Sequence, residues 1–232
     1  MKRVLITGGS RGIGFAVAKM FSQNRDFDTV LLARDFSKTD LTDLRVKAIN
    51  FDLTKLENIS KLFIEVGEID VLINAAGIMN SLALDKYPED KKTALMTTNL
   101  EAPILLSQTF APGMIKQGGG RIINVTSVAA FTGHPDIWYG ISKAGLLNVT
   151  KSLAKIWAAQ KIIVNAVSPG PTETDMLNVI PEERKTNLKG GTYLQRFAKP
   201  EEIAEVIYWL ATDAPEYLSG ACIDLTNGSY PR

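Results

Sequence analysis

Short apolar runs alternate along the chain with longer segments in which apolar residues recur at helical spacing. We expect strands at residues 3–7, 28–33, 46–51, 69–74, 121–126, 162–168 and 221–225. The first six are almost continuously apolar and mostly β-branched, which is typical of strands covered on both faces. Helical stripes lie between most of them, one through Ile13 and Val17 and another through Ile203 and Ile207. This alternation predicts an α/β fold, with a single doubly wound parallel sheet of about seven strands and helices on both faces.

The length of the chain and its connections predict one domain over residues 1–232. A chain of this size can bury one large core, and it contains no linker rich in Pro, Gly or Ser. Residues 171–199 form a long connection that contains Pro171, Pro181 and the pair Gly190 and Gly191. Because long connections often close over a site, we expect a substrate loop there.

Composition narrows the classes of partner. The 26 basic and 25 acidic residues nearly cancel and form no run of like charge, which argues against nucleic acid or a membrane surface. Cys222 is the only cysteine, so a cysteine-rich metal site is excluded and a reducing compartment fits. The apolar run after Met1 is too short for a signal peptide, and no run approaches the about 20 residues of a membrane span. We expect a cytoplasmic protein without a metal, acting on a small molecule.

Four glycines separate the first predicted strand from the first predicted helix, in "RVLITGGSRGIGFAVAKMF". A bare backbone at a helix N-terminus lets a pyrophosphate approach the N–H groups, where the helix dipole favours negative charge. The alternative is a glycine cluster that only makes a tight turn. The strand before it and the helix after it favour a nucleotide site. The cofactor contacts expected in this loop are Gly8, Ser10, Arg11, Gly12, Ile13 and Gly14.

Arg34, at the end of the second predicted strand, bears on the choice of cofactor. An acidic residue there binds the ribose hydroxyl of NAD, whereas arginine accommodates the 2′-phosphate of NADP. Together with Arg11 it could hold that phosphate by charge-assisted bonds, which favours NADP(H). The alternative is that both arginines are solvated charges, one of them paired with Asp35. Asp52, followed by Leu53, could meet the adenine or could cap the next helix.

The segment "WYGISKAG" places Tyr139 and Lys143 four residues apart, on one face of a predicted helix. A nearby ammonium favours the phenolate, so it lowers the tyrosine pKa toward a usable acid and base. By itself such a pair could be an aromatic residue of an amphipathic helix beside a surface lysine.

Taken together, these motifs resemble the short-chain dehydrogenase/reductase family, with its Rossmann-type sheet, over essentially the whole chain. The glycine loop and the Tyr139–Lys143 pair match that family, and the other matches are "NAAG" from Asn74, Asn99 in "TTNLEAP", Ser127 in "NVTS" and "SPGPTET" from Ser168. Two departures stand out. Ala75 replaces the second asparagine of the family's NNAG, and the helix between the second and third strands should be short or missing.

The resemblance implies a catalytic set. Tyr139 would be the acid and base, Ser127 would polarise the substrate oxygen, and Lys143 would lower the tyrosine pKa and bind the ribose. Asn99 would hold a relay water. Hydride would pass between NADP(H) and a carbonyl or secondary alcohol, most plausibly a ketone or 3-oxoacyl compound. The remaining implied cofactor contacts are Asn74, Ala75, Gly77, Tyr139, Lys143, Pro169, Gly170, Thr172 and Thr174.

Several alternatives stay open at this point. The chain could be an NAD-dependent alcohol dehydrogenase, or a nucleotide-binding sensor without turnover. An acyl carrier protein is a weakly supported partner, because only Lys116 and Arg121 flank the glycines before the fifth strand. His134 could touch substrate, but a lone loop histidine is more often merely exposed.

The two helices predicted near residues 99–115 and 145–160 carry wide apolar stripes. Large apolar patches are rarely left exposed on a soluble monomer. The family resemblance points the same way, to a homodimer or homotetramer. We expect Trp157 or Phe110 to lose accessible surface to a partner chain.

Overall fold

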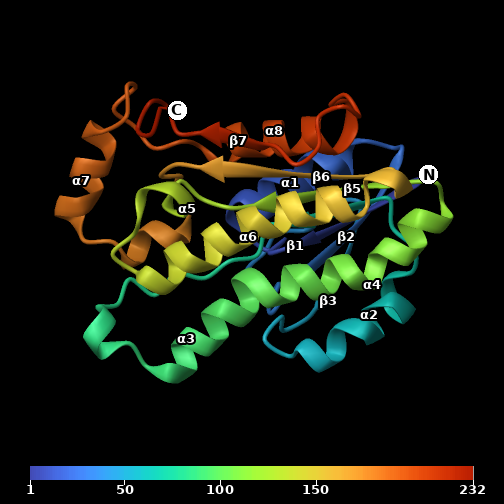
Figure 1. Ribbon diagram of the computed structural model, residues 1–232, viewed down its shortest axis with the longest axis horizontal. Coiled ribbons are helices and arrows are strands. Elements are labelled where there is room, and N and C mark those ends of the chain that lie inside the picture. The colour runs from blue at the N-terminus through green and yellow to red at the C-terminus, as the bar shows by residue number, and fades with distance from the viewer. Residues whose placement is uncertain (232) are drawn as a thin grey trace.

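The computed structural model describes residues 1–231, and its centre is a seven-stranded sheet flanked by helices (Figure 1). All neighbouring strands pair in parallel, in the order β3-β2-β1-β4-β5-β6-β7. The strands are β1 (Lys2–Thr7), β2 (Phe27–Ala33), β3 (Val46–Asn50), β4 (Val71–Asn74), β5 (Gly120–Val125), β6 (Ile162–Pro169) and β7 (Cys222–Leu225). The predicted doubly wound parallel sheet is therefore confirmed.

Helices cover both faces of the sheet and give it two cores. They are α1 (Gly12–Gln23), α2 (Ile59–Val66), α3 (Glu89–Met96), α4 (Ala102–Lys116), α5 (Ala129–Thr132), α6 (Ile137–Ile156), α7 (Glu182–Gly190) and α8 (Pro200–Thr212). In β1, Val4 and Ile6 pack with α1 and α8, whereas Leu5 packs with α2 and α4. Successive strand side chains point to opposite faces, so a strand buried on both faces reads as continuously apolar.

The connection between β2 and β3 contains turns but no helix, as the short spacing predicted. It lies against the glycine loop, because the Thr39 hydroxyl donates to the carbonyl of Ser10 over 2.9 Å. The chain leaves β2 at Arg34 and therefore stays close to the carboxyl ends of β1 and β2, where that side chain is exposed.

Residues 171–199 are partly helical, with the 3-10 helix η5 (Asp175–Val179) followed by α7. A bridge between Thr172 and Ala198 holds the two ends of the segment together. Helix α7 lies at the end of the sheet toward which the arrowheads of β6 and β7 point (Figure 1). The segment therefore projects at the carboxyl ends of the strands.

The prediction that Phe110 of α4 or Trp157 at the end of α6 loses surface to a partner chain agrees only partly with the structure. Phe110 of α4 is completely buried inside the chain, so it has no surface to lose, and that part of the prediction is wrong. At the end of α6, Ile156 is 62% exposed and Trp157 is half-buried. None of the helices within residues 1–231 combines the length and hydrophobicity needed to cross a membrane.

Candidate functional site

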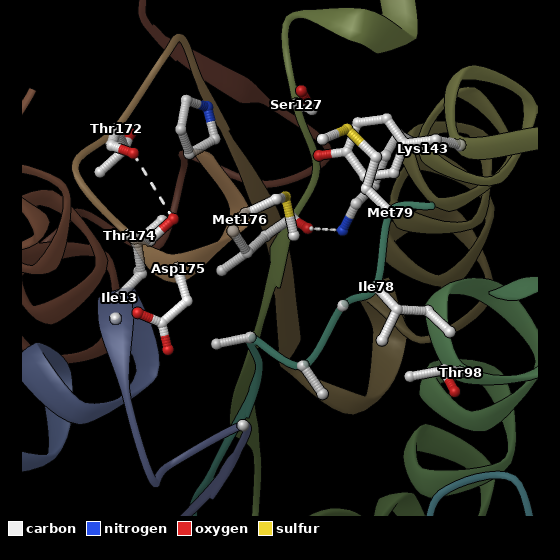
Figure 2. Close-up of a pocket in the computed structure, with 18 of the residues that line it drawn as sticks. Ile13, Ile78, Met79, Thr98, Ser127, Lys143, Thr172, Thr174, Asp175 and Met176 are labelled. Atoms are coloured by element: carbon white, nitrogen blue, oxygen red, sulfur yellow. Dashed lines mark hydrogen bonds between the residues drawn. The ribbon is translucent and has the colours of Figure 1, made fainter. Parts of the chain in front are cut away.

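A cavity of about 880 Å³ opens at the carboxyl ends of the strands. Its walls come from the glycine loop, the residues that follow β2 to β6, and the segment 171–199. The sheet order reverses between β1 and β4, and open α/β sheets bind ligands in the crevice at such a point. In Figure 2, Ser127, Lys143 and Met79 lie on one side of the pocket, Thr172, Thr174 and Asp175 lie on the other, and Met176 lies between them.

The glycines of this loop are needed for two reasons: some let the backbone pack closely, and one keeps the cavity open. Gly8 has φ +70, and a Cβ there would lie 2.8 Å from Cα of Ala76. A Cβ on Gly14 would collide with the carbonyl oxygen of Gly8, and one on Gly12 would lie 3.1 Å from Cγ2 of Thr174, across the cavity. Gly8 and Gly14 thus let the loop form, and Gly12 keeps the space in front of it open.

The start of α1 fits a pyrophosphate. Arg11 occupies the N-cap position, but its side chain makes no capping hydrogen bond. The Arg11 side chain therefore does not cap the first backbone N–H groups of α1, from Gly12 onward. These groups can donate to a ligand bound in the cavity. These groups, with the positive end of the helix dipole, suit the phosphates of a dinucleotide.

The two arginines expected at the 2′-phosphate differ in whether they form an ion pair. Arg11 forms an ion pair with Asp175 over 3.0 Å, which links the glycine loop to η5. Arg34 is exposed, lines the cavity and forms no ion pair with any residue from 1 to 231. Asp35 does not pair with either arginine, because its carboxylate accepts from the backbone and hydroxyl of Ser37. Arg34 is therefore the cation that remains available there.

Asp52 stands on the cavity wall beside Leu53. Its Oδ1 accepts from the backbone N–H of Thr54 over 2.9 Å and from the Thr54 hydroxyl over 2.8 Å. The hydrogen bond from the Thr54 backbone is the main cause that lowers the pKa of Asp52. The carboxylate closes a local turn and does not cap a helix, since the next helical turn is preceded by Lys55.

Tyr139 is buried at the other end of the cavity, 7% exposed, with Ser127 beside it. Burial raises the pKa of Tyr139, and the nearby Ser127 hydroxyl opposes that shift. The expected lowering of this pKa by Lys143 is not found. The Lys143 Nζ atom lies 5.9 Å from the centre of the tyrosine ring and donates to the carbonyl of Val125 over 2.8 Å, the dashed line beside Lys143 in Figure 2. Burial lowers the pKa of Lys143 itself to about 8.

Asn99 lies in the π-helical turn η3 (Thr97–Glu101) and is completely buried, away from the cavity lining. Its Oδ1 accepts from the N–H of Ile78 over 2.8 Å, and its Nδ2 donates to the Ile78 carbonyl and to the Ser142 hydroxyl. These bonds engage both the oxygen and the nitrogen of the amide, and the expected role of Asn99 in holding a relay water stays a prediction. In the structure, Asn99 holds Ile78 in the cavity wall and ties it to α6, next to Lys143.

Asn74 was expected to contact cofactor, but the structure buries it outside the cavity lining. Its Nδ2 donates to Oδ1 of Asn124 over 2.8 Å, and Asn124 in turn donates to the hydroxyl of Thr150 over 2.9 Å. The residue therefore joins β4 to β5 and α6. The other expected site residues all line the cavity: Gly8, Ser10, Arg11, Gly12, Ile13, Gly14, Arg34, Asp52, Leu53, Ala75, Gly77, Ser127, Tyr139, Lys143, Pro169, Gly170, Thr172 and Thr174.

Asp136 is a residue that the sequence reasoning missed. It is completely buried at the N-cap of α6, where Oδ1 accepts from the N–H of Tyr139. Its Oδ2 accepts from the N–H groups of Asn80 and Ser81 over 2.9 and 2.8 Å, so the chain after β4 is tied to the start of α6. An aspartate three residues before Tyr139 is an N-cap pattern, and that signal could have identified it.

The interpretation of His134 as a merely exposed loop residue is wrong. The side chain is half-buried and lines the cavity, with its ring centre 5.2 Å from that of Tyr139. Burial lowers the pKa of His134. Its Nε2 atom lies 3.0 Å from a guanidinium nitrogen of Arg184 on α7, a residue that the sequence did not single out.

Comparisons with known proteins agree with this geometry. A sequence model described as short chain dehydrogenase matches residues 2–185. A 3-oxoacyl-[acyl-carrier-protein] reductase from Thermotoga maritima is 36% identical, over 98% of this chain and 97% of the relative.

Two solved structures are similar over almost the whole chain. A Beutenbergia cavernae protein assigned as an NAD(P)-dependent gluconate 5-dehydrogenase, with bound NADP at low occupancy, has a TM-score of 0.92 and 26% identity, covering 98% of this chain and 96% of that one. A 4-hydroxyisoleucine dehydrogenase complexed with NADH has a TM-score of 0.90 and 28% identity, covering 99% and 98%. The chain therefore belongs to the short-chain dehydrogenase/reductase family of oxidoreductases.

Proposed function

We propose that the protein is an NADP(H)-dependent reductase of ketone or 3-oxoacyl-type carbonyl groups, able to run the reverse oxidation of a secondary alcohol. One observation carries this proposal: Tyr139, Ser127 and Lys143 line one end of a cavity whose other end holds the glycine loop and Arg34. A proton donor and a candidate dinucleotide site thus share one cavity. That combination is what hydride transfer coupled to proton transfer requires.

The side chains divide the proton chemistry between them. The bound nicotinamide supplies or accepts the hydride, and the protein only positions it. Burial raises the pKa of Tyr139, so the phenol stays protonated at neutral pH and can donate to the carbonyl oxygen. Ser127 donates a hydrogen bond to the same oxygen. Lys143, with a pKa of about 8, can return a proton near neutral pH and would hold the nicotinamide ribose.

The preference for NADP(H) rests on Arg34. The relatives carry either NADP or NADH, so the fold itself accepts both cofactors. Arg34 is a cavity-lining guanidinium that forms no ion pair with any residue from 1 to 231, although its charge helps to lower the pKa of Asp52. Arginine binds a phosphate by paired hydrogen bonds. The 2′-phosphate of NADP(H) would supply the anionic partner for this guanidinium.

The residues just before and at the start of β5 give little support for binding of an acyl carrier protein. The guanidinium of Arg121 is held inside the chain by the carbonyls of Leu210 and Ala214, over 2.9 and 2.7 Å. Lys116 lies 3.4 Å from a carboxylate oxygen of Glu68. Since an acidic carrier needs several free cations, we favour a small-molecule substrate.

The proposed function is tested by following NADPH oxidation with a panel of simple ketones, 3-oxoacyl thioesters and sugars. We expect turnover with at least one carbonyl class, and slower turnover with NADH. A protein that binds NADPH but reduces none of these compounds would be a nucleotide sensor. No binding of either cofactor would contradict the nucleotide site as well.

We also propose that the protein is a homodimer or homotetramer that buries the exposed apolar side of α6. Ile141 and Ile156 are 43% and 62% exposed, and Trp157, the residue after Ile156, is half-buried. Burying such side chains stabilises association by about 25 cal/mol per Å² of apolar surface. Light scattering should return two or four times the chain mass of 25.4 kDa. A single-chain mass at micromolar concentration would contradict this expectation.

A further inference from the structure

Arg184 is a cation that lines the cavity. The protein group that it contacts is Nε2 of His134, over 3.0 Å, and it forms no ion pair with any residue from 1 to 231. The other cations of α7 are placed differently. Lys185 pairs with Glu182, and Lys189 lies over the ring of Phe197. A guanidinium has five N–H donors, so most of those on Arg184 have no acceptor among residues 1–231.

His134 accepts a hydrogen bond from this guanidinium and is itself uncharged. A guanidinium can only donate, so Nε2 of His134 must accept, and the imidazole is neutral with its proton on Nδ1. Nδ1 lies 3.2 Å from the carbonyl of Asp136 and 3.1 Å from its backbone N–H, and with the proton on Nδ1 only the carbonyl can be its hydrogen-bond partner. Burial and the neighbouring Arg184 both lower the pKa of His134, which keeps the ring neutral. The positive charge at this place therefore belongs to Arg184.

Arg184 lies at the same end of the cavity as Tyr139, the proposed proton donor. His134 contacts it on one nitrogen and packs its ring against Tyr139, with 5.2 Å between the ring centres. One imidazole ring thus separates the guanidinium from the proposed proton donor. A group bound by Arg184 would lie a few bonds from a carbonyl bound at Tyr139.

The cavity lining includes apolar side chains and, within residues 1–231, no acid without a partner. These apolar side chains include Met176, in the middle of the pocket in Figure 2, Met79 to one side of it, and Ile180. The two aspartates of the lining are both engaged: Asp175 pairs with Arg11, and Asp52 accepts from Thr54.

An uncharged ketone would displace water from Arg184 and leave its donors unpaired, which is costly in a partly apolar site. A carboxylate would satisfy them, because its two oxygens match the planar fork of a guanidinium.

We propose that the substrates of this enzyme are oxo acids, in which a free carboxylate a few bonds from the reacting carbonyl is bound by Arg184. The inference rests on the proposed reductase function and adds the substrate class to it. It distinguishes this site from one built for neutral 3-oxoacyl thioesters. His134 is a positioning residue in this arrangement, since it acts through Arg184.

The test compares 2-oxo-, 3-oxo- and 4-oxopentanoate with their ethyl esters, which keep the carbonyl and remove the charge. We expect the wild-type enzyme to prefer at least one acid over its ester. Arg184→Gln should lower kcat/KM for that acid by about 10- to 100-fold, mainly through KM, and leave the ester within about threefold. Arg184→Lys should retain part of the preference. Lys185→Gln removes the same charge from the next residue of α7, outside the cavity lining, and should change neither substrate.

Equal use of acid and ester by the wild type, or equal losses for both with Arg184→Gln, would overturn the oxo-acid proposal while the reductase function stands. Preference for dihydroxyacetone phosphate over every oxo acid would overturn the carboxylate in favour of a phosphate. If no probe is turned over, the reductase function fails, and calorimetry with the same acids decides the inference separately. Binding that is weakened by Arg184→Gln and not by Lys185→Gln would support it, and no difference between the two variants would overturn it.

Discussion

Tyr139→Phe should lower turnover by at least about two to four orders of magnitude, the range expected when a positioned proton donor is removed. The variant loses the phenolic hydroxyl but keeps the ring, which packs against His134 with 5.2 Å between the ring centres. NADPH affinity should stay close to that of the wild type, because most of the proposed cofactor surface comes from the glycine loop and β2. Steady-state NADPH oxidation and a fluorescence titration with NADPH measure the two effects separately.

Tyr208→Phe is the matched control for this variant. Its hydroxyl accepts from Nδ2 of Asn24 over 2.7 Å, on the α1–α8 side of the sheet and outside the cavity lining. The control loses a hydroxyl and a hydrogen bond but should keep normal turnover. Near-normal turnover of Tyr139→Phe would remove the tyrosine from the role of acid, whatever the control does.

Arg34→Asp should shift the preference from NADPH toward NADH by more than tenfold, which corresponds to more than about 1.4 kcal/mol. The substitution removes the guanidinium that we propose for the 2′-phosphate and puts a carboxylate there, which repels that phosphate and can accept from a ribose hydroxyl. The measurement is the ratio of kcat/KM with NADPH to that with NADH, on one carbonyl substrate.

Lys38→Asp controls for the change in overall charge. It makes the same reversal in the same connection between β2 and β3, but Lys38 does not line the cavity. Its cofactor ratio should move little. If the ratio for Arg34→Asp also stays where it is in the wild type, Arg34 is only a surface charge and the preference must come from elsewhere.

The architecture could be predicted because each strand carries its own signal. A strand buried on both faces must be apolar at almost every position, as β1 is at Val4, Leu5 and Ile6, and this pattern is visible without knowing its neighbours. The missing helix between β2 and β3 was also predictable, since a short spacing leaves no room for one. Most of the site residues identified from motifs in fixed order line the cavity, including Ser127 and Tyr139.

Several roles inside the site could not be predicted in this way. A motif identifies Asn99 and Asn74 as residues but does not show where their amides point, and both amides are used inside the chain, by Ile78 and Asn124. The pKa of Tyr139 depends on its complete surroundings, and the cost of burying the phenolate exceeds any help from Lys143.

The parallel sheet, the glycine loop at its first turn and the Tyr139–Lys143 spacing on α6 could all be inferred from the chain alone. These features depend on residues that are close along the chain, where backbone geometry sets the periodicity. The pairing of Arg11 with Asp175 and the contact of Arg184 with His134 became visible only in the folded chain. Those partners are far apart in the sequence, and they meet because residues 171–199 fold back over the carboxyl ends of the strands, a path that no local pattern of apolar and polar residues specifies.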